Sequence, residues 1–88
     1  MRITRAAIRF HKVGEPDKWQ IWIGWRHAAI FKDMYDAGIV YDKSDYQQGF
    51  ITDEKPMNFV TREEASKIAY EAGQTKELKR TLFSEDLW

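Results

Sequence analysis

The fold is decided by the stretch Phe59-Val60-Thr61-Arg62-Glu63-Glu64-Ala65-Ser66-Lys67-Ile68-Ala69-Tyr70-Glu71-Ala72-Gly73, which holds a short apolar segment followed by a complete helix signal. Thr61 with Glu64 three residues later is the signature of a capping box at a helix start. Gly73 suits the left-handed position that ends many helices. Small apolar residues recur at helical spacing between these points, so the helix is expected to lie close against a sheet: Ala65, Ile68, Ala69 and Ala72.

The N-terminal quarter of the chain predicts an antiparallel hairpin. Over Thr4–His11, apolar residues alternate with Arg5, Arg9 and His11, which is the period of a strand with one wet face. Turn-forming residues follow over Val13–Lys18. A second alternating strand is predicted over Trp19–Gly24.

The middle of the chain predicts a helix over Arg26–Ala37, ended by Gly38. Ile39–Tyr46 fits either a short strand or an irregular crossing loop. Residues 47–52 and 57–60 are expected to form two short strands, or a β-turn unit, around a turn at 53–56. The apolar C-terminal tail, 82–88, is expected to dock rather than fray, with Ser84 capping a final helical turn.

These elements predict one α+β domain over residues 1–88, in which a small antiparallel sheet packs on two helices and the chain closes with a short helical turn. The sheet combines the N-terminal hairpin with a second short strand pair. A chain of 88 residues suffices for one domain and is too short for two. Most of its aromatic residues are expected in the core, and the excess is expected to line a pocket or a subunit interface.

Composition excludes several function classes. The chain has no cysteine, which rules out disulfides and thiolate metal sites, and two histidines without tight spacing make a poor metal site. A formal net charge of zero argues against broad nucleic-acid binding. No membrane-spanning run and no signal peptide are evident, so a cytoplasmic protein without a cofactor is expected.

Basic residues at the predicted helix starts are the first candidate site. Arg26 and Arg62 have the wrong sign for the positive end of a helix dipole. A bound phosphate or carboxylate would compensate them, since free backbone N–H groups there bind anions. The alternative is that Arg62 pairs with a neighbouring acid, for which Glu63, Asp53 and Asp86 are the options.

His27 and Trp22 are two further candidates. His27 shares an apolar stripe with Ile30 and Met34, so it is either a satisfied residue at the core edge or a ligand-binding group and general base. Trp22 has the opposite strand parity from Ile21, and it is expected to face a helix, a partner chain or a ligand. No nucleophile motif, Walker loop or dinucleotide fingerprint is present.

Several motifs together resemble a group of small tailed-phage and prophage proteins. They are Gln48-Gly49-Phe50-Ile51-Thr52, Phe59-Val60-Thr61-Arg62-Glu63-Glu64-Ala65, Ala72-Gly73-Gln74, Leu82-Phe83-Ser84-Glu85-Asp86-Leu87-Trp88, and the Arg26-His27 pair. The resemblance implies a phage-encoded protein that acts inside a bacterium. It also implies a pocket at the matching polar positions that capping does not explain, which are Arg26, His27, Gln48, Arg62 and Gln74.

Three functions fit this pattern. The first is a counter-defence protein that sequesters a nucleotide-derived signal, with Arg26 and Arg62 on phosphates, an aromatic ring such as Trp22 on the base, and Gln48 and Gln74 on its polar edges. A homodimer or larger assembly would complete the site. The second is a protein–protein inhibitor of a host nuclease or CRISPR-type complex, acting through Trp22 and the acidic patches Asp42–Asp45 and Asp53-Glu54. The third is a nucleotide-degrading enzyme with His27 as base.

Overall fold

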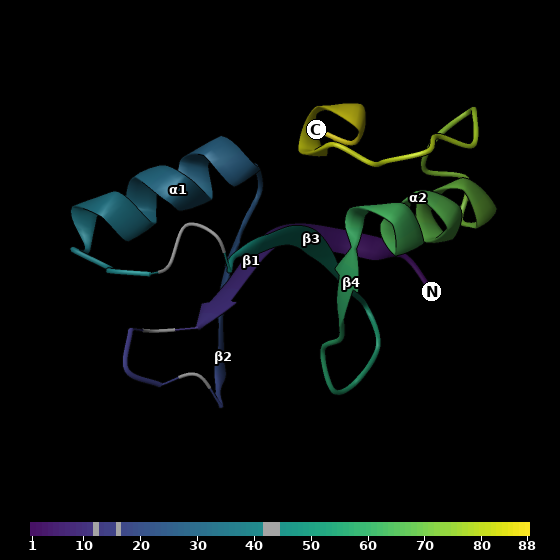
Figure 1. Cartoon of the computed structure of the whole chain (residues 1–88). Helices are drawn as coiled ribbons and strands as arrows, with labels where there is room; N and C mark the ends of the chain where they lie inside the picture. The colour runs from purple at the N-terminus through teal and green to yellow at the C-terminus, as the bar shows by residue number, and fades with distance from the viewer. Residues whose placement is uncertain (12, 16, 42–44) are drawn as a thin grey trace.

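A computed structural model describes the chain except residues 12, 16 and 42–44 (Figure 1). The expectations about Pro16 in the first turn, about part of the segment Ile39–Tyr46 and about the acidic patch Asp42–Asp45 therefore lie wholly or partly outside the described residues. None of the helices described is both long and apolar enough to cross a membrane.

A four-stranded antiparallel sheet forms the centre of the molecule. Its strands are β1 (Ile3–His11), β2 (Trp19–Gly24), β3 (Gln47–Thr52) and β4 (Phe59–Thr61), in the order β2-β1-β3-β4. Both predicted strand pairs are present, and β1 joins them by pairing with β3. The sequence pattern placed the start of the last strand at Met57, whereas β4 begins two residues later, at Phe59.

Both helices cover one face of this sheet. Helix α1 (His27–Asp36) follows β2, and α2 (Arg62–Glu71) follows β4 directly. Ile30 and Met34 of α1 and Ala65 and Ala69 of α2 join a single core with Phe10 and other residues of the strands. The predicted α+β fold is confirmed.

The capping box that predicts α2 is present with both of its hydrogen bonds. The Glu64 backbone N–H donates to Thr61 Oγ1 at 3.2 Å, and the Thr61 N–H donates to Glu64 Oε1 at 3.1 Å. The hydrogen bonds from Thr61 lower the pKa of the Glu64 carboxyl. Gly38 and Gly73, with φ of 70° and 74°, follow the last turns of the two helices, as the sequence predicts.

The core lies between the sheet and the helices and depends on a few large side chains. Phe10, Ile8 and Phe50 are completely buried, and burying one such side chain contributes about 1.5–3 kcal/mol. Leu82 is also completely buried, although it lies far beyond the last helix in sequence. The C-terminal tail is therefore part of the core.

The tail returns across the facing ends of the two helices. The Leu82 N–H donates to the Arg62 carbonyl at 3.2 Å, and a short 3₁₀ turn, η1 (Ser84–Asp86), follows. Figure 1 shows this turn above the gap between α1 and α2. At the end of the chain, the Trp88 ring packs edge-on against Trp25, with centroids 5.6 Å apart. The docked tail expected from the sequence is present.

Candidate functional site

The starts of α1 and α2 converge on the middle of β3. His27, the first residue of α1, contacts Gly49, while Arg62, the first residue of α2, contacts the neighbouring Gln48. Figure 1 shows the two helix starts facing each other across β3. The structure therefore brings together His27, Gln48 and Arg62 from three different elements.

His27 joins α1 to β3 and to the C-terminal tail. Its Nε2 lies 2.7 Å from the Gly49 carbonyl oxygen, which can only accept, so Nε2 carries the proton. Its Nδ1 then accepts from the Ser84 hydroxyl at 3.3 Å, and the His27 backbone N–H lies 3.4 Å from the same Oγ. Ser84, predicted to cap the final turn, instead caps the start of α1. Both ring nitrogens of His27 thus have partners within the chain.

Burial disfavours the charged form of this histidine. Only 5% of the His27 surface is exposed, and its ring packs edge-on against Phe50. Burial is the largest cause that lowers the pKa of His27, and the nearby positive charge of Arg62 acts in the same direction. The hydrogen bond to Gly49 opposes this shift without reversing it. Of the two interpretations given by the sequence, the structure matches a satisfied residue at the core edge.

Arg62 is held by an amide and an aromatic ring. Its Nη2 donates to Gln48 Oε1 at 2.5 Å, and its guanidinium lies 4.7 Å from the centre of the Phe83 ring. None of the acids considered as partners forms a salt bridge with it in the described part of the chain. Its Nε is buried and has no hydrogen-bond partner there, which is uncommon for a buried donor.

Arg26 and Gln74 make structural contacts near the two ends of the chain. Arg26 Nη2 donates to the main-chain oxygen of Trp88. The Gln74 side chain both accepts from the Ile3 N–H and donates to the Ile3 carbonyl, each at 2.8 Å. Gln74 thereby fixes the start of β1, and it lies apart from the group at Gly49.

Trp22 is partly buried and packs against the core on the helix side of the sheet. The alternating residues of β2 on the opposite side are exposed: Trp19 by 41%, Ile21 by 46% and Ile23 by 40%. The sequence pattern identified the two faces of this strand correctly, and of the three alternatives for Trp22 (a helix, a partner chain or a ligand) the structure matches the first.

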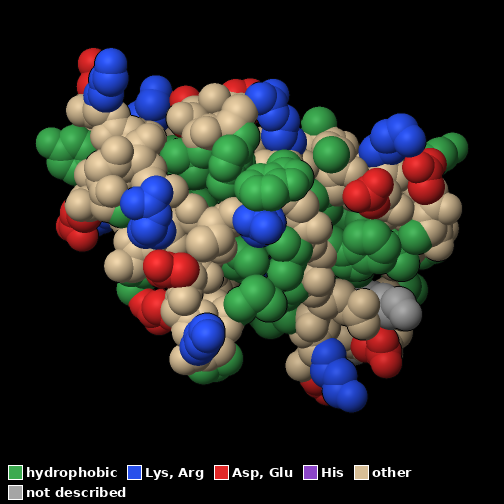
Figure 2. All heavy atoms as spheres, turned by 180° about the vertical axis from the view of Figure 1, so that it is seen from behind, with side chains coloured by type: hydrophobic (Ala, Val, Ile, Leu, Met, Phe, Trp, Pro, Cys, Tyr) green, Lys and Arg blue, Asp and Glu red, His purple; other side chains and the backbone are tan. Residues whose placement is uncertain are grey.

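These exposed residues belong to a larger surface, here called the open face, on the side of the sheet away from the helices. Pairing of the strands places their neighbours beside them. Figure 2 shows a broad hydrophobic patch on this view of the molecule, with basic side chains set among the apolar ones. The open face comprises Arg5, Arg9, His11, Trp19, Ile21, Ile23 and Phe59 above the buried Ala7 and Ile51, with Trp25 at one end and the ion pair of His11 with Asp45 at the other.

Two arginines lie flat on the aromatic rings of the open face. The Arg5 guanidinium is 3.7 Å from the centre of the Trp25 ring. Arg9 lies between Trp19 and Phe59, at 4.5 and 4.3 Å from the ring centres. Both Nε and Nη2 of Arg9 also donate to Gln47 Oε1, at 2.8 and 2.6 Å. These contacts hold each charge in a fixed position without neutralising it.

Comparison with known proteins gives one match. The model of the phage T4 y16D protein family covers residues 2–88. The chain belongs to this family. No curated protein and no solved structure matches it. The expected kinship with a small phage protein family is confirmed, while the individual motifs that suggested it stay a prediction.

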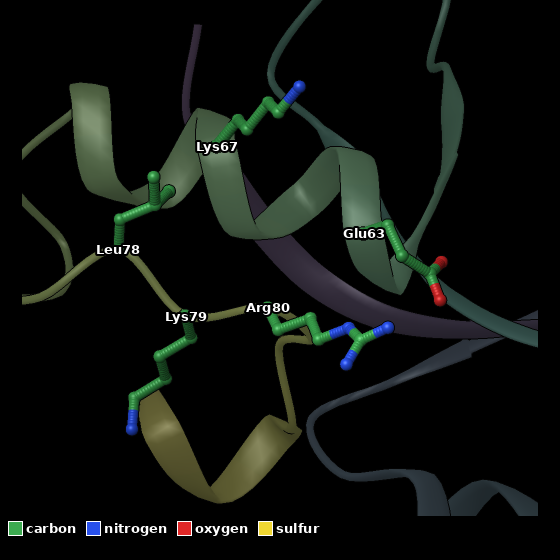
Figure 3. Close-up of a pocket in the computed structure, with 5 residues that line it drawn as sticks. All are labelled: Glu63, Lys67, Leu78, Lys79 and Arg80. Atoms are coloured by element: carbon green, nitrogen blue, oxygen red, sulfur yellow. The ribbon is translucent and has the colours of Figure 1, made fainter.

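This y16D family member also has a cavity of about 380 Å³ beside α2 (Figure 3). Figure 3 shows Lys67 and Lys79 extending from it in opposite directions, and Lys79 forms an ion pair with Asp86 at 3.4 Å. The basic groups therefore do not converge on one anion. No cluster of metal-ligating residues was found among the described residues of this family member.

Sequence reasoning missed the open face of this chain. Alternation alone does not say which side of a strand the helices cover, because Ile21 and Ile23 are as apolar as core residues. One available signal was Arg5 and Arg9, whose strand position is opposite to the buried Ala6, Ile8 and Phe10. The register of β1 with β2 then places Ile21 and Ile23 with the arginines.

Proposed function

We propose that this phage protein acts by binding another protein through its open face. Protein interfaces are enriched at their centres in tryptophan, phenylalanine and arginine, and depleted in lysine, aspartate and glutamate. The open face carries Trp19, Trp25, Phe59 and two arginines, and none of its strand residues is lysine, aspartate or glutamate. This composition is the observation that carries the proposal.

The charge of the open face indicates the chemistry of the partner. Arg5 and Arg9 form no salt bridge among the described residues, and their stacking on aromatic rings holds their positive charges on this face. A partner that buries them must supply carboxylates to offset their loss of hydration. The partner is therefore a protein with an acidic surface, and for a phage protein a host nuclease or CRISPR-type complex is the class that we propose it inhibits.

Single-stranded nucleic acid fits this face less well. Bases stack on aromatic rings, but Ile21 and Ile23 provide no stacking surface, and they occupy the same strand as Trp19. The formal net charge of zero also provides little general attraction to phosphates.

Affinity purification of the tagged chain from its bacterial host, after nuclease treatment, tests the proposal. A charge placed at Ile21 should abolish capture of the partner, while the same charge at Tyr35, which is 85% exposed on α1, should not. Ile21→Glu and Tyr35→Glu are thus a matched pair. A complex lost on nuclease treatment, or retained equally by both variants, would refute protein binding through this face.

A second candidate function is sequestration of a nucleotide-derived signal at the helix starts. The observation that favours it is the buried Arg62 Nε, which lacks a partner beside two converging helix starts. A phosphate oxygen would satisfy this donor. Calorimetry with cyclic nucleotides and ADP-ribose derivatives tests this candidate: binding that is lost in Arg62→Ala supports it, and no binding excludes it.

We do not propose catalysis by His27. A general base needs a free nitrogen within reach of its substrate. The Gly49 carbonyl and the Ser84 hydroxyl occupy the two ring nitrogens, and the ring is almost completely buried.

A further inference from the structure

The outer edge of β2 is an unprotected sheet edge. In the order β2-β1-β3-β4, β2 pairs only with β1 among the described strands, so its other side has no strand partner. Proteins usually protect such edges with charged residues, proline, bulges or very short strands. The opposite edge strand, β4, has only three residues.

Strand β2 has none of these protections. It has six residues, Trp19–Gly24, none of which is charged or proline. It pairs with β1 in an unbroken register from Ala6 with Gly24 to His11 with Trp19, so no bulge turns the edge away. Along a strand of this length, the backbone N–H and C=O groups that point away from β1 can form hydrogen bonds with another strand.

We infer that a second copy of this chain pairs with β2 in an antiparallel arrangement, which joins two sheets into one of eight strands. Residues opposite each other in an antiparallel pair point to the same face. A two-fold axis at Ile21 therefore pairs Ile21 with its own copy and Trp19 with Ile23 of the other chain, all on the open face.

In this register, the side chains of one β2 strand pack against those of its copy. Each Trp19 faces an Ile23, an aromatic–β-branched pair of the kind that stabilises antiparallel sheets, and symmetry forms this pair twice. An axis at Trp22 would instead place Gln20 opposite Gly24, which has no side chain to pack. A net charge of zero on each chain adds no overall repulsion.

Electrostatics favours pairing at this edge over stacking of two open faces. Face-to-face packing would bring Arg5 and Arg9 of one copy near those of the other, and neither arginine has a salt-bridge partner among the described residues. Burying such like charges together is strongly unfavourable. Edge pairing leaves both open faces free on the same side of the joined sheet.

Single-cysteine variants test this inference directly, because the chain has no native cysteine. Directly opposed residues have Cα atoms about 4.5–5.5 Å apart, within the range of a disulfide. Under mild oxidation, Ile21→Cys should therefore form a covalent dimer. Trp19→Cys alone should not, because the two copies of residue 19 are four residues apart along the strand, about 13 Å.

Tyr35→Cys is the control for collisional cross-linking, since it is highly exposed on α1. Sedimentation equilibrium of the unmodified chain should also give the mass of two chains. A single-chain mass, or equal cross-linking at positions 19, 21 and 35, would overturn the inference. These measurements use the purified chain alone, so they do not depend on the proposed partner.

Discussion

Replacing Gly49 with alanine should be the most damaging single-methyl change in this sheet. A Cβ at Gly49 would lie 2.2 Å from the Val60 carbonyl oxygen and 2.5 Å from Phe59 Cζ. The Phe59 ring can rotate away, but the Val60 oxygen belongs to the backbone of β4. Relieving this clash therefore requires β4 to move away from β3. That movement would disturb the three residue pairs that join the two strands.

Gly24 provides a matched comparison, since it is also a strand glycine. Its added Cβ would meet the Ile30 side chain, at 2.8 Å from Cγ1, and no backbone atom, so the buried Ile30 must shift but no strand has to move. Both substitutions reduce the conformational entropy of the unfolded chain by a similar amount, so this effect cancels in the comparison. We expect Gly49→Ala to cost about 2–3 kcal/mol, at the upper end of the range for overpacked cores, and Gly24→Ala to cost about 1 kcal/mol, at its lower end.

Thermal and urea unfolding of both variants would measure this difference. For a domain of this size, 1 kcal/mol corresponds to about 4–8 °C in Tm, so Gly49→Ala should unfold at least about 8 °C below the unmodified chain. Nearly equal losses for the two variants would refute the reasoning, because they would show that β4 yields as easily as a side chain.

Three further predictions concern the contacts that hold the helix starts and the chain ends. The pKa of His27 is lowered from 6.5 in the folded chain, so the free energy of unfolding should fall as the pH drops below about 6.5, by at most about 1.4 kcal/mol per pH unit. Urea titration at several pH values should show a weaker dependence in His27→Gln. Thr61→Ala should cost about 1 kcal/mol in the same assay through loss of the cap, and an unchanged value would contradict the capping role. Leu82→Ala should cost about 2–5 kcal/mol and expose the tail to proteolysis, whereas unchanged cleavage would show that the tail is not part of the core.

Local signals predicted the elements well because their causes are local. The capping box at Thr61 and the glycines that follow both helices involve residues within one turn of each other, so the sequence displays them directly. The alternation in β1 likewise reports a strand with two different faces. The pairing of β1 with β3 could not be read in this way, since it joins residues about forty positions apart.

The neighbours of Arg62 were predicted in part for the same reason. Arg62 stood out because its charge opposes the helix dipole, and the structure places it beside Gln48 and near His27, while Gln74 lies elsewhere. Ligand binding by these residues stays a prediction. The partners of His27 could not be predicted, because Gly49 contributes only its carbonyl oxygen and Ser84 comes from the far end of the chain. Backbone acceptors leave no signature in a sequence.

The contrast between the helix starts and the open face explains why protein binding takes precedence over ligand binding. At the helix starts, Arg26, His27 and Gln48 already have partners within the chain, and a ligand would have to displace some of them. On the open face, the arginines are held in place while the tryptophans beside them remain exposed. Binding there needs no rearrangement of the core, so none of the free energy gained by burying the aromatic surface is lost in breaking contacts within the chain.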